Sequence, residues 1–263
     1  MDTVLWPDRD EECSAAEYSA HYGGRYDTRW VTKPRPNARC PACRERVKLV
    51  GEDRPAHDRH FSHIGSSERA PYCPLRNIAD HKYVFLADAP PDSVQGRALR
   101  VSFFRNWEDH WHLWESHLGG ISDVFTFIKL IQEADKMRLW NRPNLREWEI
   151  PYIFLVWRDY PPVLNKKTGG YVRKEWHRFW FDARVRTLDD IWIRTQGPLT
   201  IVRATYAIPR SGKAPGLDQL RKTKLIYVEE DFLARGIQSK PRRFAIDKMQ
   251  EAFPGELGSA PPL

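Results

Sequence analysis

The 263-residue sequence has only four cysteines, and no stretch approaches eighteen consecutive apolar residues. The absence of a long apolar run argues against a membrane-spanning helix. The N-terminal stretch MDTVLWPDRDEECS is acidic and lacks the apolar centre of a secretory signal, so we expect a cytoplasmic protein without a membrane partner. In that reducing compartment a few clustered cysteines indicate a metal site rather than a disulfide framework.

The overall composition is that of a globular protein with a core, since 41% of the residues are hydrophobic and 29% are charged. Lys and Arg outnumber Asp and Glu by 42 to 35, a formal net charge of +7, which permits a nucleic-acid partner without requiring one. The 11 tryptophans are unusual. Because Trp is costly to expose unless it stacks on something, we expect many in the core and a few in contacts.

Three of the four cysteines lie between residues 40 and 73, with histidines among them. Cys40 and Cys43 form a C-x-x-C turn containing Pro41, which supplies two thiolates from one knuckle. Residues 46–50 are expected to form a strand, 51–58 a turn and 59–64 a returning strand. This hairpin would bring His60 or His63 back beside the knuckle.

The strand geometry favours one histidine over two, because residues three apart on a strand point to opposite faces. The preferred ligand set is therefore Cys40, Cys43, His63 and Cys73. The alternative set, which needs a helical turn, replaces Cys73 with His60. Either set gives four protein ligands to Zn²⁺ and no open position, which predicts a structural metal.

The motif CPAC, then HFSH, then a serine-rich turn ending in Cys73 resembles the N-terminal zinc-finger-like region of the competence protein CoiA-like family, over about residues 38–75. The resemblance implies a zinc module and a setting of DNA uptake, mobile elements or phage defence. Members of that family often carry a restriction-endonuclease-like domain with E/D-x-K or E-x-Q on a strand. Here the only D-x-K, Asp80–His81–Lys82, lies in a segment expected to be helical (74–88), so we do not expect catalysis.

The fold class is predicted as α+β, with a small zinc-binding β-hairpin module followed by a Trp-rich mixed sheet domain with few helices. The expected divisions are an N-terminal segment (1–30), the zinc-finger-like module with its following helix (31–89), the mixed domain (97–250) and a disordered tail (251–263). Strands are expected at 98–107, 149–157, 177–186, 198–208 and 224–232. A helix is expected at 121–140, capped by Ser122, with an apolar face of Val124, Phe125, Ile128, Leu130 and Ile131.

One predicted strand has a face that suits nucleic acid. Alternation places the following residues together on the face opposite Phe179 and Phe181: Trp176, Arg178, Trp180, Arg184 and Arg186. Exposed Trp and Arg would stack on bases and neutralise phosphates. The alternatives are a protein interface, or Trp residues packed beneath a neighbouring element. On the module itself, Arg44, Arg46 and Lys48 are candidate nucleic-acid contacts.

Three further patterns are weaker. His110, His112 and His117 suggest either a second metal or acid–base site, or an amphipathic helix with core tryptophans and solvated histidines. The SGK of residues 211–213 lacks the upstream glycine of a phosphate-binding loop and indicates a basic loop. Cys13 stands in an acidic setting that should raise its pKa and blunt its nucleophilicity.

Together these patterns predict a zinc-stabilised nucleic-acid-binding subunit, acting with a protein partner in a DNA- or RNA-processing or defence complex. The alternatives are a metal-dependent nuclease with a diverged active site, and a protein–protein adaptor that does not contact nucleic acid.

Overall fold

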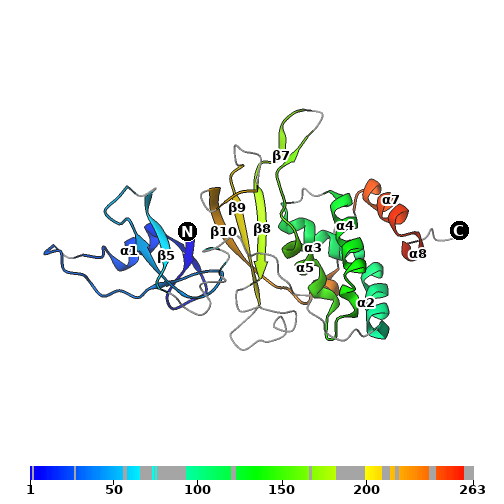
Figure 1. The fold of residues 1–263 in the computed structure, drawn as a ribbon, viewed down its shortest axis with the longest axis horizontal. Coiled ribbons are helices and arrows are strands. Elements are labelled where there is room, and N and C mark those ends of the chain that lie inside the picture. Colours follow the sequence, from blue (N-terminus) through cyan, green and yellow to red (C-terminus); the bar gives the residue numbers. More distant parts are fainter. Residues whose placement is uncertain are drawn as a thin grey trace. The chain divides into compact units, whose positions relative to one another are not determined.

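The structure is a computed structural model that describes residues 1, 3–26, 28–55, 58–65, 73, 75, 93–119, 123–165, 168–181, 199–208, 214–216, 219–236 and 241–257. The chain divides into two compact units (Figure 1). The first, here the β unit, contains strands β1–β5 and β8–β10 with helix α1. The second, the helical unit, contains α2–α8 and the hairpin β6–β7. The predicted α+β class is confirmed.

The β unit begins with a five-stranded antiparallel sheet in the order β2-β1-β3-β4-β5. Its strands are β1 (Thr3–Leu5), β2 (Glu12–Ser14), β3 (Ala38–Arg39), β4 (Arg46–Val50) and β5 (His60–His63). Helix α1 (Ala15–Tyr22) follows β2, and Ser14 and Glu17 form a capping box at its start. The buried side chains of the sheet include Val4, Leu5, Val47, Leu49 and Phe61.

The predicted hairpin is confirmed, with β4 at 46–50 and β5 within 59–64. Along β4, Val47 and Leu49 are buried whereas Arg46 and Lys48 are exposed. This alternation follows from the two-residue period of a strand, and it leaves the basic side chains on the solvent face.

A second sheet in the β unit has the order β10-β9-β8 and is antiparallel throughout. Its strands are β8 (Trp176–Phe181), β9 (Thr200–Tyr206) and β10 (Leu220–Tyr227), which lie within or overlap the segments predicted at 177–186, 198–208 and 224–232. These strands group with the N-terminal sheet. The division at residues 30, 89 and 97 stays a prediction.

The helical unit contains α2 (Ser93–Arg105), α3 (Trp107–His117), α4 (Val124–Lys136), α5 (Ile150–Trp157), α6 (Phe232–Arg235), α7 (Arg243–Ala252) and α8 (Pro254–Leu257). Two 3₁₀ turns, η3 (Leu139–Asn141) and η4 (Glu147–Glu149), and a hairpin of β6 (Val163–Leu164) and β7 (Tyr171–Arg173) complete it. α3 packs against both α2 and α5 (Figure 1). Among the described residues, no helix combines the length and the apolar character needed to cross a bilayer.

Two segments predicted as strands are helices. Of the segment predicted at 149–157, residues 150–157 form α5, in which every side chain from Ile150 to Val156 is buried. A short element buried all round has the same apolar pattern as a helix or as a central strand, so periodicity could not separate the two. Pro151 at the first turn agrees with a helix, because a helix start does not need that N–H. Residues 98–107 fall mainly in α2, where Phe103 and Phe104 are buried and Val101 is exposed.

The predicted helix at 121–140 is confirmed as α4, with differences at its start and on its face. The N-cap is Asp123, whose side chain accepts a hydrogen bond from the Phe125 backbone N–H, whereas the expected cap, Ser122, lies outside the described residues. Phe125 is exposed, and Phe127 takes its place on the buried face.

The expectation of a disordered tail from residue 251 is wrong as far as residue 257. α7 continues to Ala252 and α8 follows at once. The buried Phe253 between them packs on Phe104, with ring centroids 5.0 Å apart, which anchors this end of the chain to α2.

Candidate metal centre

The knuckle between β3 and β4 presents the first two thiols. The Arg44 backbone N–H donates to the Cys40 carbonyl at 2.9 Å, and the Cys40 N–H donates to the Glu45 carbonyl at 2.8 Å. These two bonds close a tight turn with the side chains of Cys40 and Cys43 on its inner side. Pro41 and Ala42 at its centre are buried.

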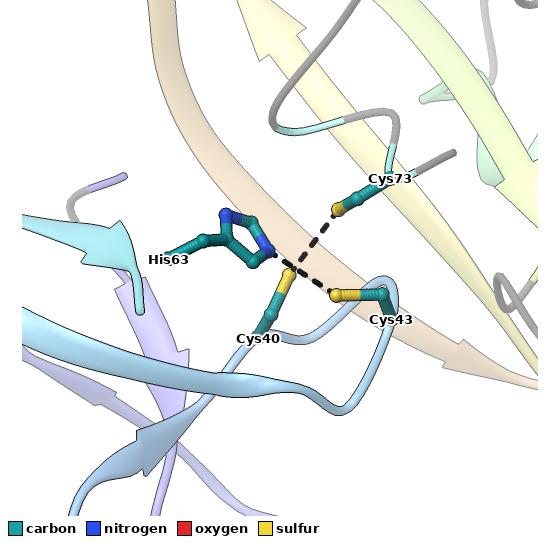
Figure 2. Close-up of side chains that lie close together, drawn as sticks. All are labelled: Cys40, Cys43, His63 and Cys73. Atoms are coloured by element: carbon teal, nitrogen blue, oxygen red, sulfur yellow. Dashed lines mark hydrogen bonds between the residues drawn. The ribbon is translucent and has the colours of Figure 1, made fainter. Parts of the chain in front are cut away.

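Four side chains converge at this knuckle (Figure 2). The Sγ atoms of Cys40 and Cys73 lie 3.6 Å apart, and the Sγ of Cys43 lies 3.2 Å from Nε2 of His63. The ligand atoms of all four residues lie within 4.8 Å of one another, and within the described part of the chain they form the one such group. This cluster can hold a metal ion, and it is the preferred set predicted from the sequence.

The register of the β4–β5 hairpin decides between the two histidines. His63 pairs with Val47, beside the knuckle, whereas His60 pairs with Val50 at the far end. The His60 side chain is exposed, and its Nδ1 lies 3.2 Å from the Asp58 carbonyl. The alternative ligand set with His60 is therefore wrong, because an extended strand turns residues three apart to opposite faces.

Burial and mutual contact set the protonation of the thiols. Cys40, Cys43 and Cys73 are all fully buried. Hydrogen bonds from Cys40 and then Cys73 lower the pKa of Cys43, whereas burial raises the pKa of Cys40. With protein groups alone, one thiolate is stabilised at the expense of its neighbours. A bound cation is what would allow all three to be thiolates together.

Arg44 has a different place from the one expected for a nucleic-acid contact. Its side chain is only 10% exposed, donates to an Asp10 carboxylate oxygen at 2.8 Å and reaches the Thr200 hydroxyl at 3.4 Å. Its φ of 62° lies in the left-handed region. Arg44 therefore holds the knuckle against β1–β2 and β9 rather than projecting into solvent.

The predicted exposed Trp/Arg face is also wrong where the structure describes it. Trp180 is 1% exposed and Arg178 is 8% exposed. Arg178 donates to the Pro215 carbonyl at 3.1 Å and lies over the Tyr206 ring at 5.4 Å, while Trp176 is half-buried. Both faces of β8 are covered. The alternation of side chains in the sequence correctly indicated which residues share a face, but it could not show that both faces are buried. Arg184 and Arg186 lie outside the described residues.

Arg46 and Lys48 remain as exposed cations on β4, adjacent in sequence to the knuckle. That these two residues contact nucleic acid stays a prediction. Both side chains are exposed to solvent, as such contacts require. The segment 74–88 with Asp80 to Lys82 and the SGK at 211–213 lie outside the described residues.

The histidines of 107–120 lie on α3 and do not gather. His112 is exposed, and His110 is buried with Nε2 3.0 Å from an oxygen of Glu147. The prediction of an amphipathic helix with core tryptophans is confirmed, since Trp107, Trp111 and Trp114 are buried. The expectation that the histidines are solvated is wrong for His110, which is buried. Glu147 is 37 residues from His110, and sequence spacing gave no signal of this pair.

Cys13, the fourth cysteine, is 1% exposed on β2 and far in the chain from the cluster. Burial, then the nearby Glu17 carboxylate, raises its pKa to about 12. The predicted direction is correct, with burial as the main cause.

No family model, no curated protein and no solved structure matches this chain.

Proposed function

We propose that Cys40, Cys43, His63 and Cys73 bind a structural Zn²⁺. Zn–S bonds of about 2.3 Å and Zn–N bonds of about 2.0 Å in a tetrahedron require S···S separations of about 3.8 Å and S···N separations of about 3.5 Å. The observed 3.6 Å and 3.2 Å are close to these values. Three thiols and an imidazole also suit zinc better than an oxygen-seeking cation.

The metal would act as a cross-link. His63 ends β5, the two knuckle cysteines lie between β3 and β4, and Cys73 comes ten residues after His63. One ion would tie these three pieces together, in a small sheet whose strands are two to five residues long. Four protein ligands leave no site for a reacting water, so the proposed role is structural rather than catalytic.

We infer that the zinc-bound sheet is a nucleic-acid-binding module, working as a subunit of a larger DNA- or RNA-processing or defence complex. The observation that carries this inference is the exposed basic face of β4, where Arg46 and Lys48 stand on the solvent side of a strand adjoining the knuckle. The formal net charge of +7 favours the approach of a polyanion. The resemblance to the CoiA-like family points the same way and is part of the proposal.

The test is a titration against labelled single- and double-stranded DNA and RNA, with Mg²⁺ present, at two salt concentrations. We expect salt-sensitive binding and intact strands on a denaturing gel. Arg46→Ala with Lys48→Ala should reduce the slope of log K against log salt by about 1.8 on duplex DNA, since each phosphate contact contributes about 0.9. Arg221→Ala with Lys224→Ala is the control, because it removes two exposed cations from β10 of the same unit.

An unchanged salt slope in the β4 variant would mean that residues other than Arg46 and Lys48 contact the phosphates. Cleaved strands would instead support the diverged nuclease. Absence of both binding and cleavage would support the protein–protein adaptor.

A further inference from the structure

An aromatic hairpin loop projects from the β unit between α1 and β3. We call residues 23–37 the tongue, of which all but residue 27 are described. Its two sides are joined by an antiparallel bridge between Tyr26 and Thr32 and by a bond from the Lys33 N–H to the Arg25 carbonyl at 2.7 Å. These two backbone links close the tongue as a hairpin.

The tip of the tongue exposes two aromatic rings side by side. Trp30 is 78% exposed and Tyr26 is 45% exposed, and their ring centroids are 5.8 Å apart. Trp30 has a φ of 61°, a conformation that a bulky residue rarely adopts. The guanidinium of Arg25 lies 5.6 Å from the Tyr26 ring centroid. An exposed Trp held beside a second ring and a cation is a surface suited to stacking on another flat group.

A basic cavity lies at the base of the tongue. It has a volume of about 330 Å³, and its lining includes four cationic residues, Arg25, Lys33, Arg35 and Lys48, together with Tyr18. None of its lining residues is acidic. Arg35 is partly neutralised by an ion pair with Glu52. Lys33 and Lys48 are exposed, and neither is ion-paired with any residue that the structure describes.

We propose that the tongue and this cavity bind single-stranded nucleic acid, with an unpaired base stacked on Trp30 and backbone phosphates held by Lys33 and Lys48. The inference rests on the proposed function and adds the strand class and the contacts. Lys48 connects this inference to the proposed function, because its side chain belongs both to the basic face of β4 and to the wall of the cavity.

The chemistry of the two features favours a single strand over a duplex. A flat ring at a hairpin tip can stack only on a base whose face is open, and in a duplex those faces are covered by neighbouring pairs. The cations at the cavity supply the sequence-independent attraction to phosphate that such binding needs. A protein partner would use the rings but would have no general need for a cavity whose charged side chains are all cationic.

The experiment compares base-bearing and abasic strands. We would titrate the zinc-loaded 263-residue protein with a labelled twelve-nucleotide DNA strand, with the same strand carrying abasic positions at its centre, and with a duplex. Trp30→Ala should weaken binding of the base-bearing strand by about 5- to 150-fold, the range for loss of one stacked base. It should change binding of the abasic strand and of the duplex less than twofold, and Trp30→Phe should restore most of the loss.

A second variant tests the phosphate contacts. Lys33→Ala with Lys48→Ala should lower the salt slope on the single strand by about 1.4, since each contact contributes about 0.7. Arg221→Ala with Lys224→Ala removes the same charge from β10 and should leave the slope unchanged. Circular dichroism and the unfolding midpoint of each variant check that the fold is retained.

The outcomes separate this inference from the proposed function. If Trp30→Ala binds the base-bearing strand as well as the wild type does, or loses equally on the abasic strand, stacking is refuted while nucleic-acid binding stands. Binding of duplex alone refutes the single-strand assignment in the same way. If the wild type binds no nucleic acid, both fail, and a protein becomes the partner to seek for the tongue.

Discussion

Arg44 offers a test of how the knuckle is held, because two opposing effects meet at one residue. It is the residue after Cys43, its φ is 62°, and its largely buried side chain pairs with Asp10. Replacing it with Ala removes the ion pair and keeps the left-handed backbone. Replacing it with Gly removes the same ion pair and also removes the steric cost of that backbone conformation.

The difference between the two variants isolates the backbone. A left-handed conformation costs a residue with a Cβ about 1–2 kcal/mol. Glycine avoids this cost, but about 0.4–1 kcal/mol of the gain in stability is offset because the unfolded chain is more flexible with glycine than with alanine. Taking the middle of each range, Arg44→Gly should be more stable than Arg44→Ala by about 0.8 kcal/mol, although both should be less stable than the wild type.

The assay is urea unfolding of both variants at saturating zinc, with zinc affinity measured by competition against a chromophoric chelator. The Gly variant should also hold zinc at least as tightly as the Ala variant, since the turn that positions Cys43 is less strained. Equal stability of the two variants, or a more stable Ala variant, would refute the reasoning. Nucleic-acid binding should change less in either than in Arg46→Ala with Lys48→Ala.

Three further predictions follow from buried groups. Trp180→Ala should lower the free energy of unfolding by about 3–5 kcal/mol, because the ring is 1% exposed; a cost below about 1 kcal/mol in urea would mean that the ring is on the surface. Burial lowers the folded pKa of His110 below its ordinary 6.5, so the proton is taken up more readily by the unfolded chain and stability should fall as the pH drops below 6.5. Although burial raises the pKa of Glu147, hydrogen bonds from His110, Ser102 and Asn106 lower it overall, so this carboxylate should add to the loss below pH 4.5. His110→Gln, which keeps a hydrogen-bond donor without the titration, should remove the part of the urea-midpoint shift that begins at pH 6.5. Cys13, with a pKa of about 12 and 1% exposure, should resist alkylation at pH 8 until urea unfolds the β unit, and fast labelling of the native protein would contradict its placement.

The candidate metal ligands could be predicted from the sequence because their geometry is local. The C-x-x-C turn fixes two ligands, and the strand period separates His63 from His60. Only the position of Cys73 does not follow from local geometry, because it depends on how the chain after His63 returns to the knuckle. The β4–β5 hairpin could also be predicted from the sequence, because β4 alternates apolar and basic residues, as expected for a strand with one buried and one exposed face.

Two of the wrong predictions, at α5 and at β8, share a physical cause, which is burial on more than one side. α5 is buried all round, so its apolar run fits a central strand as well as a helix. β8 alternates Trp and Arg with Phe, but neighbours cover both faces, and Arg178 meets a backbone carbonyl and a Tyr ring rather than solvent. Alternation along one strand reports which side chains share a face and not what covers that face. The tongue could not be predicted from the sequence for a different reason, because the exposure of Trp30 depends on a hairpin that has a single bridge.

The most direct test of the central claim is the zinc content of the purified protein and of single-ligand variants. We predict one zinc per chain in the wild type, and loss of it in Cys40→Ser, Cys43→Ser, His63→Ala and Cys73→Ser. His60→Ala, three residues from a ligand but exposed at the far end of β5, should keep its zinc. A wild type without zinc after purification in its presence, or ligand variants that retain a full equivalent, would contradict the account.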